Sequence, residues 1–120
     1  MKKKILIVDD SAFSRSIMKK AIQSMGYEII QASNGKEAIT VYQAEKPDAV
    51  TMDLLMPDMD GMDAVRKIRE NDPDARIIIC STDKQKFRQE EAKSTGTVGF
   101  VPKPVDTGVL EGILAGLFNE

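Results

Sequence analysis

The sequence has a single cysteine, Cys80, among its 120 residues, and it has no large excess of charge of either sign. One cysteine excludes an intramolecular disulfide, and its place at the end of the apolar run Ile77 to Cys80 predicts a small buried thiol. The chain has 17 basic and 19 acidic residues, a net charge of -2, and no basic cluster beyond Lys2, Lys3 and Lys4. It therefore lacks the charge pattern of a nucleic-acid-binding protein.

Long apolar segments are also missing at the start of the chain. The run Ile5 to Val8 that follows the three lysines is too short for the core of a signal peptide, and it ends in two aspartates. We therefore expect no membrane association and a cytoplasmic location. The sequence shows no internal repeat, low-complexity tract or linker, so we expect one domain, residues 1–120.

Five short apolar runs alternate with five segments of helical pattern. The runs have little polar alternation, which favours a parallel sheet covered by helices on both faces and predicts an α/β fold. The strands are expected at Lys4 to Val8, Glu28 to Ala32, Ala49 to Met52, Ile77 to Cys80 and Val98 to Val101. The helices are expected at about Phe13 to Met25, from Asn34 to about Glu45, from about Gly61 to Asn71, between Asp83 and Thr95, and at about Thr107 to Phe118.

Two of the expected helices have unusual compositions. Between Asp83 and Thr95 the only apolar residues are Phe87 and Ala92, so we expect weak packing and low local stability there. In the last helix Gly108, Gly112 and Gly116 recur every fourth residue opposite the apolar side. This smooth side would allow a second helix to approach, either in a weak dimer or from a kinase, whereas a monomer with a frayed last helix is the alternative. By contrast, the first helix is expected to pack one broad apolar side, formed by Phe13, Ile17, Met18, Ala21, Ile22 and Met25.

Charged residues follow three of the expected strands. Asp9 and Asp10 come after the first strand, Asp53 after the third and Lys103 after the fifth. Because the carboxyl ends of parallel strands open onto one crevice, we expect these side chains to meet. Three carboxylates in one crevice repel one another unless a cation intervenes, and Mg²⁺ prefers such oxygen ligands. With Lys103 as a second positive charge, the sequence predicts a place to hold a divalent cation beside a phosphate.

Four motifs in this order resemble the receiver domain of two-component response regulators, most closely the single-domain chemotaxis type. They are the pair Asp9-Asp10, the segment Met52 to Gly61, the hydroxyl of Ser81 after the fourth strand, and Lys103-Pro104. The resemblance implies a (βα)5 doubly wound, flavodoxin-like fold with a five-stranded parallel sheet in the order 2-1-3-4-5. It also implies a Lys103-Pro104 peptide bond that is often cis.

The resemblance further implies a chemistry. Asp53 would accept a phosphoryl group from a phosphohistidine of a sensor histidine kinase. Asp10, Asp53 and the backbone carbonyl of Leu55 would bind Mg²⁺ directly, and Asp9 would act largely through water. Lys103 would pair with the acyl phosphate.

A switch and an output are implied as well. Ser81 would bond a phosphoryl oxygen, and Phe100 would turn inward in response, although plain core packing of Phe100 is the alternative. The protein would be a phosphoacceptor with self-catalysed phosphoryl transfer and autodephosphorylation rather than an enzyme. A downstream protein would bind at the fourth helix, fifth strand and fifth helix. With no output domain in 120 residues, the signal would pass to another protein, or the chain is a receiver from a longer one.

Other classes on a similar fold fit less well. A haloacid-dehalogenase-like phosphatase needs a second acid two residues after its nucleophile, where this chain has Leu55. A flavin-binding protein needs a phosphate-binding loop after the first strand, where Asp9 and Asp10 would repel phosphate. A protein-interaction module that works without phosphorylation stays open.

Overall fold

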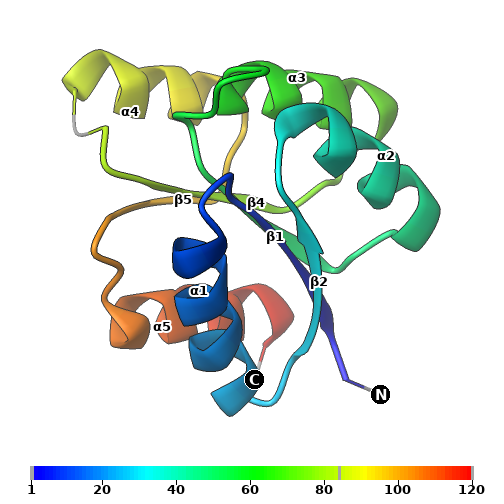
Figure 1. Ribbon diagram of the computed structural model, residues 1–120, viewed down its shortest axis with the longest axis vertical. Coiled ribbons are helices and arrows are strands. Elements are labelled where there is room, and N and C mark those ends of the chain that lie inside the picture. Colours follow the sequence, from blue (N-terminus) through cyan, green and yellow to red (C-terminus); the bar gives the residue numbers. More distant parts are fainter. Residues whose placement is uncertain (1, 84, 120) are drawn as a thin grey trace.

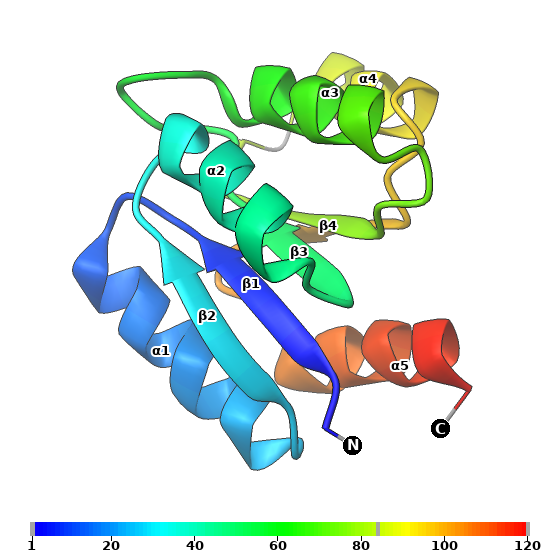
Figure 2. The ribbon, with the colours of Figure 1, turned by 90° about the vertical axis from the view of Figure 1, so that its right-hand side faces the viewer.

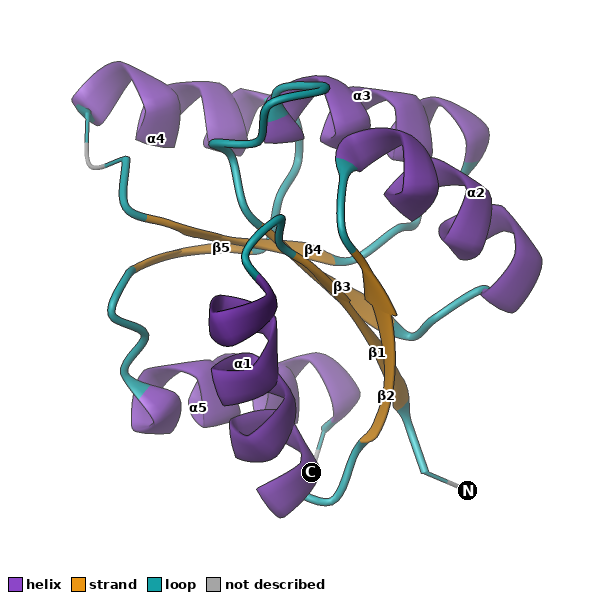
Figure 3. Ribbon diagram, viewed as in Figure 1, coloured by secondary structure: helices purple, strands orange, loops and turns teal. Residues whose placement is uncertain are grey.

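The sheet has five parallel strands in the order β2-β1-β3-β4-β5, as predicted. The computed structural model describes residues 2–83 and 85–119, apart from the side chain of Phe87. Figures 1 and 3 show one twisted sheet between two layers of helices. The strands are β1 (Lys4–Val8), β2 (Glu28–Ala32), β3 (Ala49–Met52), β4 (Ile77–Ser81) and β5 (Gly99–Pro102).

Five helices cover the two faces of the sheet. Helices α1 and α5 lie on one face, and α2, α3 and α4 lie on the other (Figures 1 and 2). In β1, Leu6 and Val8 belong to the core under α2 and α3, whereas Ile5 and Ile7 belong to the core under α1 and α5. This alternation explains why the strand is apolar throughout, because both of its faces are buried. The helices are α1 (Ala12–Ser24), α2 (Gly35–Glu45), α3 (Gly61–Asn71), α4 (Lys86–Ser94) and α5 (Thr107–Phe118).

Side-chain caps fix where the helices begin. Asn34 accepts a hydrogen bond from the N–H of Glu37 at 2.8 Å, and the Glu37 carboxylate accepts one from the N–H of Ser33 at 2.9 Å. Ser11 caps α1 and Asp60 caps α3 in the same general way. Helix α1 starts four residues after the end of β1 and α3 starts nine residues after the end of β3, so the first turns of both lie on the side of the carboxyl edge of the sheet.

Helix α1 packs less of its apolar side than its sequence predicts. Met18 and Ile22 are buried, but Phe13 is 76% exposed and Ile17 is 53% exposed. The expectation that all of these residues pack was therefore wrong. Phe13 and Ile17 lie in the first two turns of the helix, where they line a hollow beside Lys103 and Val105 that opens to solvent.

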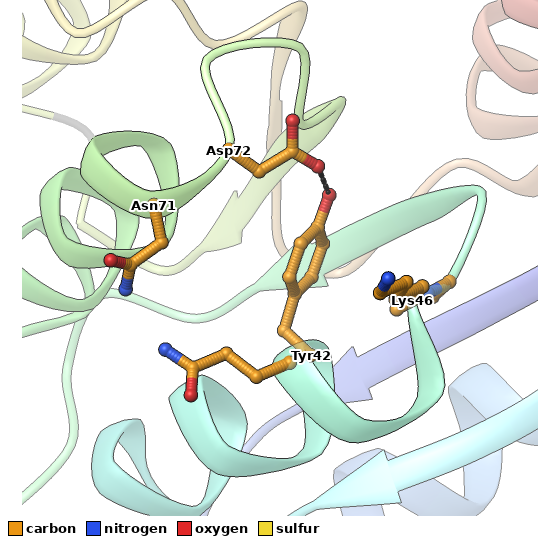
Figure 4. A pocket seen from close by; sticks show the side chains of 6 residues that line it. Tyr42, Lys46, Asn71 and Asp72 are labelled. Carbon is orange, nitrogen blue, oxygen red and sulfur yellow. Dashed lines mark hydrogen bonds between the residues drawn. The ribbon is translucent and has the colours of Figure 1, made fainter.

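An open pocket lies between the ends of α2 and α3, at the opposite end of the sheet from the carboxylates. Figure 4 shows the hydroxyl of Tyr42 on α2 donating to the carboxylate of Asp72, just after α3, at 2.7 Å. Burial raises the pKa of Tyr42, and its hydrogen bond with Asp72 raises the pKa further. This bond ties the ends of two helices together.

In the described part of the chain, no helix combines the length and apolar character needed to cross a membrane.

Ion pairs of Arg88 connect helix α4 to neighbouring segments. Ala92 is buried, and the predicted contribution of Phe87 falls on a side chain outside the described structure. The guanidinium of Arg88, only 11% exposed, donates to Asp60 at 2.6 Å and to Glu91 at 3.0 Å. It also lies 3.3 Å from Asp83 in the loop before α4. One arginine therefore joins α4 to the cap of α3 and to the loop after β4.

We expect Arg88→Met to loosen α4 selectively. The substitution removes charge-assisted hydrogen bonds, which should lower the free energy of local opening by about 1–2 kcal/mol. Amide hydrogen exchange should therefore accelerate in residues 86–94 more than in the other four helices. Lys86→Met, at an exposed position of the same helix, is the matched control and should change little. Equal protection of α4 in Arg88→Met and in wild type would show that the ion pairs do not hold the helix.

Candidate functional site

The three predicted carboxylates meet at the carboxyl edge of the sheet. One oxygen from each of Asp9, Asp10 and Asp53 lies within 4.8 Å of the others. Asp9 is 2% exposed and Asp53 is 7% exposed, whereas Asp10 is exposed to solvent. The site is therefore an acidic crevice that is closed on the Asp9 side and open on the Asp10 side.

Lys103 enters the same crevice from the end of β5. Its ammonium lies 2.5 Å from Asp9 Oδ2 and 3.3 Å from Asp53 Oδ2, and the side chain is 16% exposed. The Lys103-Pro104 peptide bond is cis, in agreement with the expectation. The backbone N–H of Lys103 donates to the carbonyl of Ser81 at 2.9 Å, so the base of the lysine is fixed to β4.

The electrostatics of the crevice follow from burial and from these pairs. Burial raises the pKa of Asp53, and the negative charge of Asp9 raises it further. The positive charge of Lys103 lowers this pKa but does not cancel the rise. Burial alone would lower the pKa of Lys103, but its hydrogen bond to Asp9 and the charges of Asp53 and Asp9 outweigh it, so that this pKa is raised. Lys103 is therefore held as a cation, and the charge of Asp53 is only partly compensated.

The two predicted switch residues lie on the neighbouring strands β4 and β5. Ser81 is fully buried at the end of β4, and its hydroxyl oxygen accepts a hydrogen bond from the N–H of Asp83 at 3.1 Å. Phe100 is partly buried and packs against the core under α4. Leu55 is 51% exposed next to Asp53, and its N–H lies 3.4 Å from Asp53 Oδ1.

Asp53 is positioned by the tightly folded loop between β3 and α3. The N–H of Gly61 donates to the carbonyl of Leu54 at 2.9 Å. A Cβ atom at position 61 would lie 2.0 Å from the carbonyl oxygen of Asp53, so only glycine fits there. Met59 packs against Gly35 of α2, which closes the loop onto a second helix.

Two residues of the first turn of α1 also reach the crevice, and the sequence did not reveal them. The hydroxyl of Ser14 donates to Asp9 Oδ2 at 2.5 Å and accepts from the Lys103 ammonium at 3.1 Å. Arg15 donates to the backbone carbonyl of Asp9 at 2.6 Å. Their place one turn after the two aspartates was the available signal, but serine and arginine there are equally typical of a solvated helix face.

The donor set suits a hard divalent cation. Mg²⁺ takes oxygen ligands, uses one or two carboxylates directly, and completes its octahedron with water and phosphate oxygens. Three carboxylates, one of them open to solvent, meet this requirement, whereas a soft metal would prefer thiolate or thioether ligands. The acidic cluster is thus compatible with Mg²⁺.

Comparison with known proteins identifies the family. The sequence model of one protein family, the response regulator receiver domain, matches residues 5–115 of this chain. The chemotaxis protein CheY of Thermotoga maritima is 47% identical over 105 residues, which cover 87% of this chain and 88% of that protein. The sporulation initiation phosphotransferase F of Bacillus subtilis is 33% identical over 106 residues, which cover 88% of this chain and 86% of that protein.

A solved structure agrees in fold. The complex of CheX and CheY with BeF3 and Mg²⁺ from Borrelia burgdorferi contains a chain that matches with a TM-score of 0.92 and 32% identity, covering 97% of this chain and 89% of that one. The chain belongs to the family of response regulator receiver domains. Membership of this family implies phosphorylation-dependent signalling.

Proposed function

We propose that this receiver domain is a Mg²⁺-dependent phosphoacceptor in which Asp53 takes a phosphoryl group from a phosphohistidine of a sensor histidine kinase. The observation that carries the proposal is the meeting of Asp9, Asp10, Asp53 and Lys103 at one edge of the sheet. A carboxylate is a weak nucleophile, so transfer requires in-line positioning and compensation of charge on the phosphoryl oxygens.

Each residue has a distinct part in this proposal. Asp53 supplies the attacking oxygen, and Lys103 donates to the phosphoryl group. Asp10, Asp53 and the carbonyl of Leu55 would hold Mg²⁺ directly and Asp9 through water. The bound cation would compensate charge on the phosphoryl oxygens and help to align the donor. Ser81 would bond a phosphoryl oxygen once its loop moves.

The rim of the crevice is suited to a protein as the phosphodonor. An apolar hollow beside Lys103 is lined in part by Phe13, Ile17 and Val105. Exposed apolar side chains at a functional opening are typical of a contact surface. A kinase that reaches Asp53 from this side would cover them.

The phosphorylated form would signal to a separate protein through the face formed by α4, β5 and α5. Val98 and Val109 on this face are 42% and 51% exposed, and a hollow next to Phe100 lies between α4 and β5. Inward movement of Phe100 would alter this hollow and bias two existing states of the domain. The domain would work in the cytoplasm as a monomer or a weak dimer, with chemotaxis, the process named for the CheY relatives, as its output.

The proposal is tested by incubation with Mg²⁺ and acetyl phosphate, followed by intact-mass measurement. We expect one added phosphoryl group on wild type, and none on Asp53→Asn or without the metal. Beryllofluoride, which binds only to a competent site, separates fast hydrolysis from inactivity. A protein that takes neither group and binds its partner equally well under all conditions would be a phosphorylation-independent module instead.

Leu55 is expected to slow the loss of the phosphoryl group. The exposed leucine beside Asp53 offers no side-chain hydrogen bond to an attacking water. Leu55→Asn should therefore shorten the lifetime of the acyl phosphate by about fivefold. The decay is followed by mass spectrometry after removal of the phosphodonor, with Leu55→Met as the apolar control. A lifetime that is the same in all three proteins would refute this role.

A further inference from the structure

Ser14 occupies a place in the crevice where it contacts two of the charged groups. It lies in the first turn of α1, and its own N–H donates to the capping Ser11 at 3.2 Å. Side chains in a helix tilt towards the N-terminus, which directs the Ser14 hydroxyl back towards the loop that carries Asp9. The hydroxyl then donates to Asp9 Oδ2 and accepts from Lys103.

These contacts complete the coordination of the Lys103 ammonium. An ammonium has three N–H donors, and Lys103 has three acceptors, namely Asp9 Oδ2 at 2.5 Å, Ser14 Oγ at 3.1 Å and Asp53 Oδ2 at 3.3 Å. Two of these acceptors are carboxylates, and Ser14 is the neutral one. The shortest contact draws the ammonium towards Asp9, away from the phosphoacceptor.

We propose that Ser14 is a positioning residue for phosphoryl transfer, which acts by holding Lys103 between Asp9 and Asp53. The inference rests on the proposed function of Asp53. By donating to Asp9 Oδ2, the Ser14 hydroxyl satisfies part of the hydrogen-bonding capacity of that carboxylate. The attraction of Asp9 for the Lys103 ammonium is weaker as a result. The same hydroxyl accepts from the ammonium and limits its rotation. Lys103 is thereby kept within reach of the oxygens that a phosphoryl group on Asp53 would bring.

Removal of the hydroxyl has a defined consequence. Without it, Asp9 relies more on Lys103, and the ammonium loses one of its three acceptors. The first change draws the positive charge towards Asp9 and away from the transferred group, and the second leaves the ammonium less firmly held, so the maximal rate of phosphorylation falls. The binding of a small phosphodonor, by contrast, depends little on Ser14, because the hydroxyl contacts Asp9 and Lys103 instead.

The test measures the phosphorylation rate against acetyl phosphate concentration at saturating Mg²⁺. In Ser14→Ala the maximal rate falls about fivefold, with the half-saturating donor concentration unchanged. Ser14→Thr retains a hydroxyl and stays within about twofold of wild type. Ser16→Ala, which removes an exposed serine from the same helix, is the matched control and keeps the wild-type rate.

A double-mutant cycle with Lys103→Met shows whether Ser14 acts through the lysine. In the Lys103→Met background, Ser14→Ala causes no further loss of rate, because the group that it positions is gone. A full additional fivefold loss there, or a rate in Ser14→Ala equal to that of Ser16→Ala, would overturn this inference while leaving the phosphoacceptor role intact. Wild-type protein that takes up neither a phosphoryl group nor beryllofluoride would instead overturn the proposed function and this inference with it.

Discussion

Lys103→Met should slow phosphorylation of Asp53 by about 100-fold, the usual effect of removing one preorganised charged donor from a transferring group. Methionine keeps the length and unbranched shape of lysine but supplies no charge. The ammonium contacts both Asp9 and Asp53, so its loss removes a cation that compensates the two most buried carboxylates of the site. The measurement is the initial rate with acetyl phosphate and Mg²⁺, followed by intact mass.

The control for this prediction is Lys67→Met, at an exposed position of α3 remote from the cluster in sequence. Lys103→Arg keeps the charge but not the geometry, and its rate should lie between those of wild type and Lys103→Met. The folding of Lys103→Met is checked by its unfolding temperature, which should fall and be partly restored by Mg²⁺, since a ligand that binds the folded state stabilises it. A rate within twofold of wild type would show that Lys103 does not compensate the transferred charge.

Gly61→Ala should lower the free energy of unfolding by about 3 kcal/mol or more. The added Cβ would lie 2.0 Å from the Asp53 carbonyl oxygen and 2.8 Å from Leu54 Cα. Both contacts are with backbone, so a change of side-chain rotamer cannot relieve them. The loop must move, and Asp53 must move with it. We therefore expect the unfolding temperature to fall by about 10 °C, together with slower phosphorylation of the protein that remains folded.

Gly112→Ala is the matched control for this substitution. A Cβ atom at Gly112 meets nothing within 4 Å, and the residue lies inside helix α5. Alanine should therefore stabilise the protein by about 0.5–1 kcal/mol, the ordinary gain for replacing a helix-interior glycine. Equal stability of Gly61→Ala and wild type would mean that the loop after β3 yields easily and does not fix Asp53.

Much of the fold could be predicted because its signals are local. The apolar run of β1 and the capping sequence at Asn34 each depend on a few neighbouring residues, and both appear as expected. The convergence of Asp9, Asp10 and Asp53 also follows from topology alone, because parallel strands share one carboxyl edge. Some boundaries differ from the prediction by one residue; strand β4, for example, extends to Ser81.

The remaining features depend on contacts between distant segments. Periodicity showed that α1 has an apolar side but not how much of it the sheet would cover, so Phe13 was misjudged. Ser14 gains its role from Lys103, which lies 89 positions further along the chain. Arg88 likewise holds α4 through Asp60, 28 positions away. In each case the residue type is ordinary for a helix surface, and only the folded chain supplies its partner.

Borohydride reduction of the phosphorylated protein, followed by peptide mapping, tests directly whether Asp53 carries the phosphoryl group. Borohydride reduces an aspartyl phosphate to homoserine, which marks the residue that was modified. We expect homoserine at position 53 after incubation with Mg²⁺ and acetyl phosphate, and none when Mg²⁺ is left out. Homoserine at position 9 or 10, or equal labelling without the metal, would contradict it.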